Sequence, residues 1–137
     1  MKNILIDSDI LMDFLVKRNP FFRDASKILT LCERKEINGY TTPVIISNIY
    51  YLMRRVDKHE TAIKKLRKLM DFIDIAVIDK QDIIRALESD FSDFEDALQN
   101  YAAEKSRKID AIITRNIKDY KHSALNVLTP TEFLNIL

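Results

Sequence analysis

The fold class is indicated by one short segment near the N-terminus, Ile4-Leu5-Ile6-Asp7-Ser8-Asp9-Ile10-Leu11. Its first three residues are apolar, a run of the length and composition of a buried strand, and the run ends at Asp7. Ile10 and Leu11 then begin an apolar pattern with helical spacing. A buried strand that leads directly into an amphipathic helix is typical of a βαβ unit, so this segment predicts an α/β fold.

The same alternation of short apolar runs and longer helical patterns continues along the chain. Strands are expected over residues 4–6, 40–42, 75–78, 112–113 and 127–128. Helices are expected after Thr42-Pro43 and over residues 21–34, 60–72, 81–88, 94–105 and 133–137. This order predicts a three-layer α/β/α architecture with a mainly parallel central sheet of four to five strands. No internal repeat or linker interrupts the pattern, so residues 1–137 are expected to form a single domain.

Glycine is unusually scarce, and its scarcity excludes several classes of enzyme. Gly39 is the single glycine among 137 residues, whereas average usage would give about nine or ten. A glycine-rich phosphate loop and a glycine-flanked nucleophile elbow both require several glycines. Most nucleotide-cofactor enzymes and serine hydrolases are therefore excluded.

Charge and cysteine content narrow the choice further. The chain has 22 Lys and Arg against 21 Asp and Glu, a net charge of +1, which gives no overall attraction to nucleic acid or to a membrane surface. Cys32 is the single cysteine, and it lies on the apolar face of a predicted helix, where we expect a small core side chain. Together with the distant His59 and His122 it does not form an ordinary zinc site. No run is apolar enough to span a membrane and no signal-peptide pattern is present, so we expect a cytoplasmic protein.

Polar side chains follow the predicted strands at the edge where parallel α/β sheets bind ligands. Asp7 ends the first strand, Asn48 lies in the helix after the second, and Asp93 and Asp96 begin the helix before the fourth. The fourth strand is followed by Thr114, Arg115, Asn116 and Asp119. Clustered carboxylates repel one another and are stabilised by a hard cation such as Mg²⁺. The pattern therefore predicts a divalent-metal site able to polarise a phosphoryl oxygen and activate water for phosphodiester hydrolysis.

Other charged residues have structural interpretations. Asp13 is expected on the solvated face of the first helix, and Glu95, three residues after Ser92, is expected to complete a capping box. Residues 54–68 contain seven basic and two acidic side chains, which we interpret as a solvated helix face. The alternative is an electrostatic guide for an RNA backbone, formed by Arg54, Arg55, Lys64, Lys65 and Lys68.

Several segments resemble the PIN domain family, and in particular its VapC-like bacterial and archaeal members, in order and spacing over essentially the whole chain. These segments are residues 4–11, Asp93-Phe94-Glu95-Asp96-Ala97-Leu98-Gln99, Ala111-Ile112-Ile113-Thr114-Arg115-Asn116-Ile117-Lys118-Asp119-Tyr120 and Thr129-Pro130-Thr131-Glu132-Phe133-Leu134. The resemblance implies an α/β/α fold and an endoribonuclease dependent on Mg²⁺ or Mn²⁺. It also implies the toxin of a toxin–antitoxin pair, with a small antitoxin protein as partner and a homodimeric assembly.

The resemblance also assigns roles to residues of this chain. Asp7 and Asp96 correspond to metal-binding acids, with Asp93 and Asp119 as further catalytic acids beside them. Supporting positions are Asn48, Asn116 and Thr114. Arg115 lies beside the site, where it either contacts a substrate phosphate or is an ordinary solvated side chain.

Two departures from the family pattern leave an alternative open. The helix after the second strand usually supplies a Glu where this chain has Asn48, and the usual Thr-x-Asp after the fourth strand ends here in Asn116. A catalytically weakened module that binds nucleic acid or protein is therefore the second hypothesis. A haloacid-dehalogenase-type phosphatase, suggested by Asp7-Ser8-Asp9, is disfavoured because no glycine follows Gly39 to form its late glycine-aspartate loop. A response-regulator receiver is disfavoured because its acidic pair, phosphoacceptor and late Lys do not align.

Overall fold

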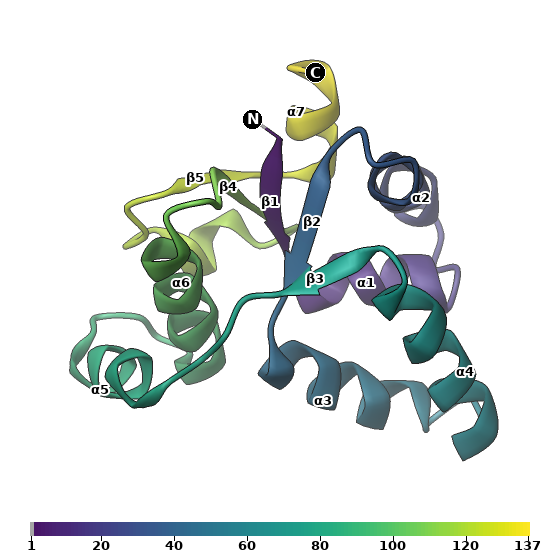
Figure 1. Ribbon diagram of the computed structural model, residues 1–137, viewed down its shortest axis with the longest axis horizontal. Coiled ribbons are helices and arrows are strands. Elements are labelled where there is room, and N and C mark those ends of the chain that lie inside the picture. The colour runs from purple at the N-terminus through teal and green to yellow at the C-terminus, as the bar shows by residue number, and fades with distance from the viewer. Residues whose placement is uncertain (1) are drawn as a thin grey trace.

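The computed structural model describes residues 2–137, which form a five-stranded sheet with helices on both faces (Figure 1). The strands are β1 (Asn3–Ile6), β2 (Asn38–Thr41), β3 (Ile73–Ile75), β4 (Ala111–Ile113) and β5 (Asn126–Leu128). The helices are α1 (Ser8–Leu15), α2 (Phe22–Glu33), α3 (Pro43–Met53), α4 (His59–Met70), α5 (Lys80–Glu88), α6 (Phe94–Ser106), the 3-10 helix η1 (Ile117–Tyr120) and α7 (Pro130–Asn135). Within these residues, no helix is both long enough and apolar enough to cross a membrane.

The sheet is parallel throughout, with the strand order β3-β2-β1-β4-β5. Leu5 of β1 lies opposite Tyr40 of β2 on one side and Ile112 of β4 on the other. The chain builds outward from β1 to β3, then returns to place β4 on the opposite side of β1. The strand order therefore reverses between β1 and β4, and in sheets of this kind ligands bind beyond the carboxyl ends of the strands at such a point. The predicted α/β fold is confirmed.

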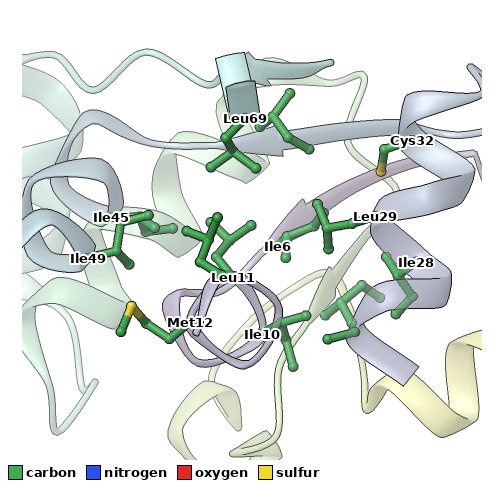
Figure 2. Close-up of a cluster of buried hydrophobic side chains, with 14 of the residues drawn as sticks. Ile6, Ile10, Leu11, Met12, Ile28, Leu29, Cys32, Ile45, Ile49 and Leu69 are labelled. Atoms are coloured by element: carbon green, nitrogen blue, oxygen red, sulfur yellow. The ribbon is translucent and has the colours of Figure 1, made fainter. Parts of the chain in front are cut away.

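Side chains that alternate along the strands build a core on each face of the sheet. Ile4 and Ile6 point to the face covered by α1 through α4, whereas Leu5 points to the face covered by α6. Figure 2 shows the first core, in which Ile6 meets Leu11 of α1 and Leu29 of α2. Burial on both faces is why the central strands read as continuous apolar runs.

Gly39 of β2 is required by a close approach of α2 and β3. A Cβ atom at this position would lie 2.7 Å from the Cys32 Sγ and 2.7 Å from the Ile73 Cδ1. Cys32 itself is buried, and that burial raises the pKa of its thiol to about 12. The residue is therefore an inert core side chain, as the apolar pattern of its helix predicts.

The third strand differs from its predicted position. It was expected over residues 75–78, but β3 covers Ile73–Ile75 at the edge of the sheet. The Ala76 N–H still donates to the Thr41 carbonyl oxygen, at 2.7 Å, and the chain then leaves the sheet. Val77 is 64% exposed. An apolar run beside an edge strand does not by itself specify which of its residues pair, because β2 ends at Thr41 and offers no further partners.

Candidate metal centre

Asp7 occupies the point where the strand order reverses. It follows β1 and serves as the N-cap of α1, with one carboxylate oxygen accepting from the Ser8 N–H at 2.7 Å. The other oxygen accepts from the Thr114 hydroxyl, at 2.9 Å, and Thr114 directly follows β4. The residue is only 6% exposed. The start of α1 and the segment after β4 thus hold this carboxylate from two sides.

Asp96 approaches the same place from the first turn of α6. The N-cap of α6 is Asp93, whose carboxylate accepts from the Asp96 N–H at 3.0 Å. The predicted capping box of Ser92 and Glu95 is therefore wrong by one residue, because the helix begins at Phe94. The Asp96 carboxylate itself accepts a hydrogen bond from the Tyr120 hydroxyl at 3.2 Å.

Electrostatics indicate that the predicted acids lie close together. Burial raises the pKa of Asp96 to about 7, and repulsion from Asp7, Asp93 and Asp119 adds to this shift. Burial likewise raises the pKa of Asp7 to about 6, with a further contribution from Asp9. A carboxylate responds in this way only to negative charges a short distance away. The structure therefore brings all four predicted catalytic acids into one electrostatic neighbourhood.

The donor set of this cluster fits a hard divalent cation. The hydrogen-bond donors that reach Asp7 and Asp96 are a backbone N–H and two hydroxyls, all uncharged. Asp9 has a buried Oδ1 atom with no hydrogen-bond partner among the described residues. Across residues 2–137 no three Asp, Glu, His or Cys side chains converge into a ready-made metal cage. Mg²⁺ does not need one, since it is commonly held by one or two carboxylates, water and substrate phosphate.

Asn48 lies beside the acidic cluster, on α3. Its side-chain N–H donates to the Glu95 carboxylate of α6. Glu95 is exposed and does not take part in the capping of its helix. The amide at residue 48 therefore holds an acid that comes from a different element.

The segment after β4 contributes through its backbone as well as its side chains. The Thr114 hydroxyl lies 2.9 Å from Asp7 and 3.4 Å from Asp9, and it accepts from the Asn116 N–H at 3.1 Å. The Arg115 N–H donates to the Asp9 carboxylate at 3.0 Å. Thr114 is thus placed to orient the acids, whereas the Asn116 side chain is exposed at the rim.

The expectation that Asp13 lies on the solvated face of α1 is wrong. Asp13 is fully buried and accepts from the Nε atoms of Arg18 and Arg115, each at 2.9 Å. The Arg115 guanidinium also stacks on the Phe21 ring, 3.8 Å from its centroid. Arg115 remains partly exposed, at 30% of its side-chain area. Its guanidinium is therefore anchored by Asp13 and Phe21 at the edge of the acidic cluster.

Two lysines of the basic segment, on α4, lie elsewhere. Lys65 donates to Asp57 at 2.8 Å, and together with Lys68 it lines a cavity of about 630 Å³ between α1, α2 and α4. This cavity contains none of the four acids. Lys65 and Lys68 are therefore not part of the acidic cluster.

Tyr120 and Gln99 join the site although sequence reasoning did not select them. The Tyr120 hydroxyl lies 2.9 Å from the Gln99 Oε1 atom, and both residues are buried. Gln99 follows Asp96 by three residues, a spacing that places both on one face of α6 and was available as a signal. Nothing in the sequence distinguishes Tyr120 from an apolar core residue.

Comparison with known families identifies the chain once this geometry is known. The family model of the PIN domain matches residues 3–118, most of the chain. The chain belongs to the PIN domain family. A search of curated proteins gives no match.

Solved structures with the same fold cover nearly the whole of this PIN domain chain. The VapBC2 structure from Rickettsia felis, bound to a DNA fragment from their promoter, has a TM-score of 0.67 at 14% identity, covering 92% of this chain and 97% of that one. A toxin–antitoxin complex from Klebsiella pneumoniae has a TM-score of 0.66 at 23% identity, covering 93% and 98%. The sarcin-ricin loop cleaving toxin VapC20 of Mycobacterium tuberculosis has a TM-score of 0.62 at 15% identity, covering 80% and 87%. At these identities the similarity is one of fold.

Proposed function

We propose that this PIN domain protein is a metal-dependent endoribonuclease that cleaves RNA phosphodiester bonds and acts as the toxin of a toxin–antitoxin pair. The observation that carries the proposal is the convergence of Asp7 and Asp96, from separate elements, in a partly buried site without a positive partner. Two buried carboxylates in mutual repulsion are unfavourable unless a cation joins them. The toxins among the structural neighbours support the biological part of the proposal.

In this proposal the chain's own residues bind and orient the reacting groups. Asp7 and Asp96 hold Mg²⁺ or Mn²⁺, while Asp93 and Asp119 add negative charge beside them. The cation, when bound, polarises a phosphoryl oxygen and lowers the pKa of water. Thr114 keeps the Asp7 carboxylate in place by its hydrogen bond. These residues would allow the protein to act on a phosphodiester without a glycine-rich phosphate loop.

The remaining side chains have supporting roles in the proposal. Arg115, anchored by Asp13 but partly exposed, contacts a phosphate of the RNA. Asn48 and Asn116 lie at the rim as neutral amides, Asn48 through its bond to Glu95.

The proposed partners and assembly are those implied by the resemblance to VapC-like PIN domain toxins. The proposed partners are RNA, a small antitoxin and a second copy of the chain in a homodimer, within the cytoplasm. Residues 1–137 would act as one domain. Neighbours solved as toxin–antitoxin complexes support an antitoxin partner.

A module that binds RNA or protein without cleaving it is the second candidate. Asn48 favours it, because its amide leaves the α3 side of the site without an acid of its own. In that case the fold and the acidic cluster remain while turnover is lost.

A Mn²⁺ titration against cleavage of an RNA oligonucleotide tests the two candidates. The wild type, Asp7→Asn and Asp96→Asn are compared with Asp71→Asn, an exposed acid that precedes β3 at the opposite edge of the sheet. We expect the first two variants to lose about 100-fold or more in rate, as for loss of a group that acts on the reacting atoms, and the control to lose nothing. Equal rates in all four proteins would overturn the site assignment. A wild type that binds RNA but never cleaves it would support the binding module.

A further inference from the structure

Tyr120 brings a hydroxyl into a part of the core that is otherwise apolar. The residue ends η1 and is 1% exposed, in a cluster with Leu5 and Ile112 of the sheet. Its ring also meets the edge of Phe91 at 6.2 Å between centroids. Packing alone would be satisfied by phenylalanine, which buries no polar atom. A buried hydroxyl is tolerated only where it has hydrogen-bond partners.

The partners of this hydroxyl are side chains of the acidic cluster and of α6. Its oxygen lies 2.9 Å from Gln99 Oε1 and 3.2 Å from Asp96 Oδ1. Burial raises the pKa of Asp7, and Tyr120 is among the groups that oppose this rise. The hydroxyl therefore contacts the Asp96 carboxylate of α6 and lies close enough to Asp7, at the end of β1, to influence its pKa.

The donor inventory gives these bonds a direction. An ionised carboxylate only accepts, and a tyrosine hydroxyl has one proton to give. The Gln99 amide can present its N–H₂ group to the Tyr120 oxygen by a half-turn, since its oxygen and nitrogen are interchangeable in shape. Gln99 then donates to the Tyr120 oxygen, and Tyr120 donates its single proton to the Asp96 carboxylate.

We propose that Tyr120 is a positioning residue of the metal centre, whose hydroxyl, held by Gln99, orients the Asp96 carboxylate toward Asp7. The inference rests on the proposed function, because it concerns the two acids assigned there to the cation. Hydrogen-bond partners of metal ligands fix ligand orientation, and their loss typically weakens metal affinity about 10- to 100-fold. Tyr120 does not contact the reacting atoms, so its role is confined to affinity for the cation.

The first test uses metal-free protein, so its outcome does not depend on activity. Carbon-13 NMR of aspartate-labelled protein reports the carboxyl resonances of Asp7 and Asp96 in the wild type and in Tyr120→Phe. We expect the Asp96 resonance to shift when the hydroxyl is removed. The control, Phe91→Leu, alters the packing of the same ring and leaves the hydroxyl in place, so the Asp96 resonance should stay where it is.

The second test measures Mn²⁺ binding by calorimetry and cleavage of an RNA oligonucleotide in the same proteins. We expect Tyr120→Phe to raise the Kd for Mn²⁺ about 10-fold or more, while kcat at saturating Mn²⁺ remains within about twofold of the wild type. Gln99→Leu should shift the Kd in the same direction by a smaller factor. A merely structural role would lower the melting temperature and leave the Kd unchanged.

The outcomes separate this inference from the proposed function. An Asp96 resonance that is identical in the wild type and Tyr120→Phe would overturn the inference, whether or not the wild type cleaves RNA. A shifted resonance with an unchanged Kd would overturn it as well. A wild type that binds no Mn²⁺ and cleaves no RNA would instead refute the proposed function, while the NMR result would still report on the orientation of Asp96.

Discussion

Asp7 and Asp13 are both buried and only six residues apart in the sequence, but their carboxylates have different hydrogen-bond donors. Asp13 is fully buried, and its carboxylate accepts from the guanidinium groups of Arg18 and Arg115. Asp7 is 6% exposed, and its donors are the Ser8 N–H and the Thr114 hydroxyl. Within the described part of the chain, arginines neutralise the charge of Asp13, whereas no cationic side chain pairs with Asp7.

The difference separates an acid that is paired within the chain from an acid that we propose binds a cation. The Asp13 pairs join α1 to the turn before α2 and to the segment after β4, so they fix the loop on which Thr114 sits. Within residues 2–137, Asp7 gains no such compensation. A buried charge that the chain leaves unpaired is a candidate for a ligand that supplies the missing charge.

Removing both arginines should have the largest effect, because it gives Asp13 the environment that Asp7 has. We expect Arg18→Gln/Arg115→Gln to lower the free energy of unfolding by about 3–5 kcal/mol at pH 7, since it leaves a buried charge unpaired. Urea denaturation measures this change. The control is Arg85→Gln, which loses an exposed ion pair to Glu104 and should change stability by less than about 1 kcal/mol. Equal effects of the two changes would show that Asp13 is no better compensated than a surface residue.

The pH dependence of stability should show that the charges of Asp7 and Asp96 are not neutralised by cationic partners. The pKa values of Asp7 (about 6) and Asp96 (about 7) in the folded protein lie above the unfolded value of 3.8. The folded state therefore binds more protons than the unfolded state between these limits, and the free energy of unfolding falls as pH rises from about 4 to about 7. Because Asp96 is partly exposed and the two acids are coupled, we expect a total fall of about 2 kcal/mol.

Urea denaturation in EDTA at pH 4.5 and 7.5 measures this fall. Added Mn²⁺ should restore most of the lost stability at pH 7.5 and little at pH 4.5, where protons compete for the same carboxylates. A metal-free protein whose stability stays flat over this range would contradict the raised pKa values. Asp7→Asn, which removes one of the two titrating groups, should flatten the profile in part.

Asp96→Asn should make the metal-free protein more stable while it weakens the binding of metal. The substitution removes a negative charge that is disfavoured by burial and by repulsion from Asp7, Asp93 and Asp119. We therefore expect a gain of about 1 kcal/mol at pH 7.5 after allowing for partial exposure. At pH 4.5, where Asp96 is protonated, the gain should vanish. Parallel melting curves with Asp71→Asn provide the control. A loss of stability at pH 7.5 would mean that Asp96 has a structural partner, as Asp13 has.

The fold and the position of the candidate acids at the ligand-binding edge could be predicted because both follow from local patterns. Buried parallel strands read as apolar runs, as at Ile4–Ile6, and the residue that ends such a run lies at the ligand-binding edge. The position of Asp7 and Asp96 near the ligand-binding edge can therefore be predicted before any tertiary contact is known. The start of α6 shows the limit of this reasoning. Ser92 and Asp93 are both good N-cap residues, each with an acid three positions later, and only the packed helix selects Asp93.

Asp13 and Tyr120 could not be predicted because their partners are distant in sequence. Asp13 looks like a surface residue of an amphipathic helix, and its partner Arg115 is 102 residues away. The Tyr120 ring fits the apolar pattern, and only the fold brings its hydroxyl to Asp96, 24 residues away. Burial of a polar group is decided by tertiary packing, whereas the sequence pattern records only that a side chain is polar.

Asn48→Glu should have the smallest effect. It tests whether the proposed cation site, which includes Asp7 and Asp96, extends to α3. Asn48 donates to Glu95, so a glutamate there would add a negative charge and replace an attraction with a repulsion. Affinity for divalent cations rises with the number of ligand charges, and we expect Asn48→Glu to lower the Kd for Mn²⁺ by about 3- to 10-fold. The metal-free protein should lose a few tenths of a kcal/mol, because Glu95 is exposed.

The matched control for Asn48→Glu is Asn48→Gln, which has the same length without the charge. Calorimetry with Mn²⁺ on both variants separates the effect of charge from that of size. If the two variants bind Mn²⁺ equally well, a charge at residue 48 does not act on the cation, and the cation site does not extend beyond α6 to α3. If Asn48→Glu also cleaves RNA where the wild type does not, the amide at residue 48 is the reason for a silent active site. The contrast between Asp7 and Asp13 would then extend to α3, where one neutral side chain decides whether the acidic cluster holds a cation.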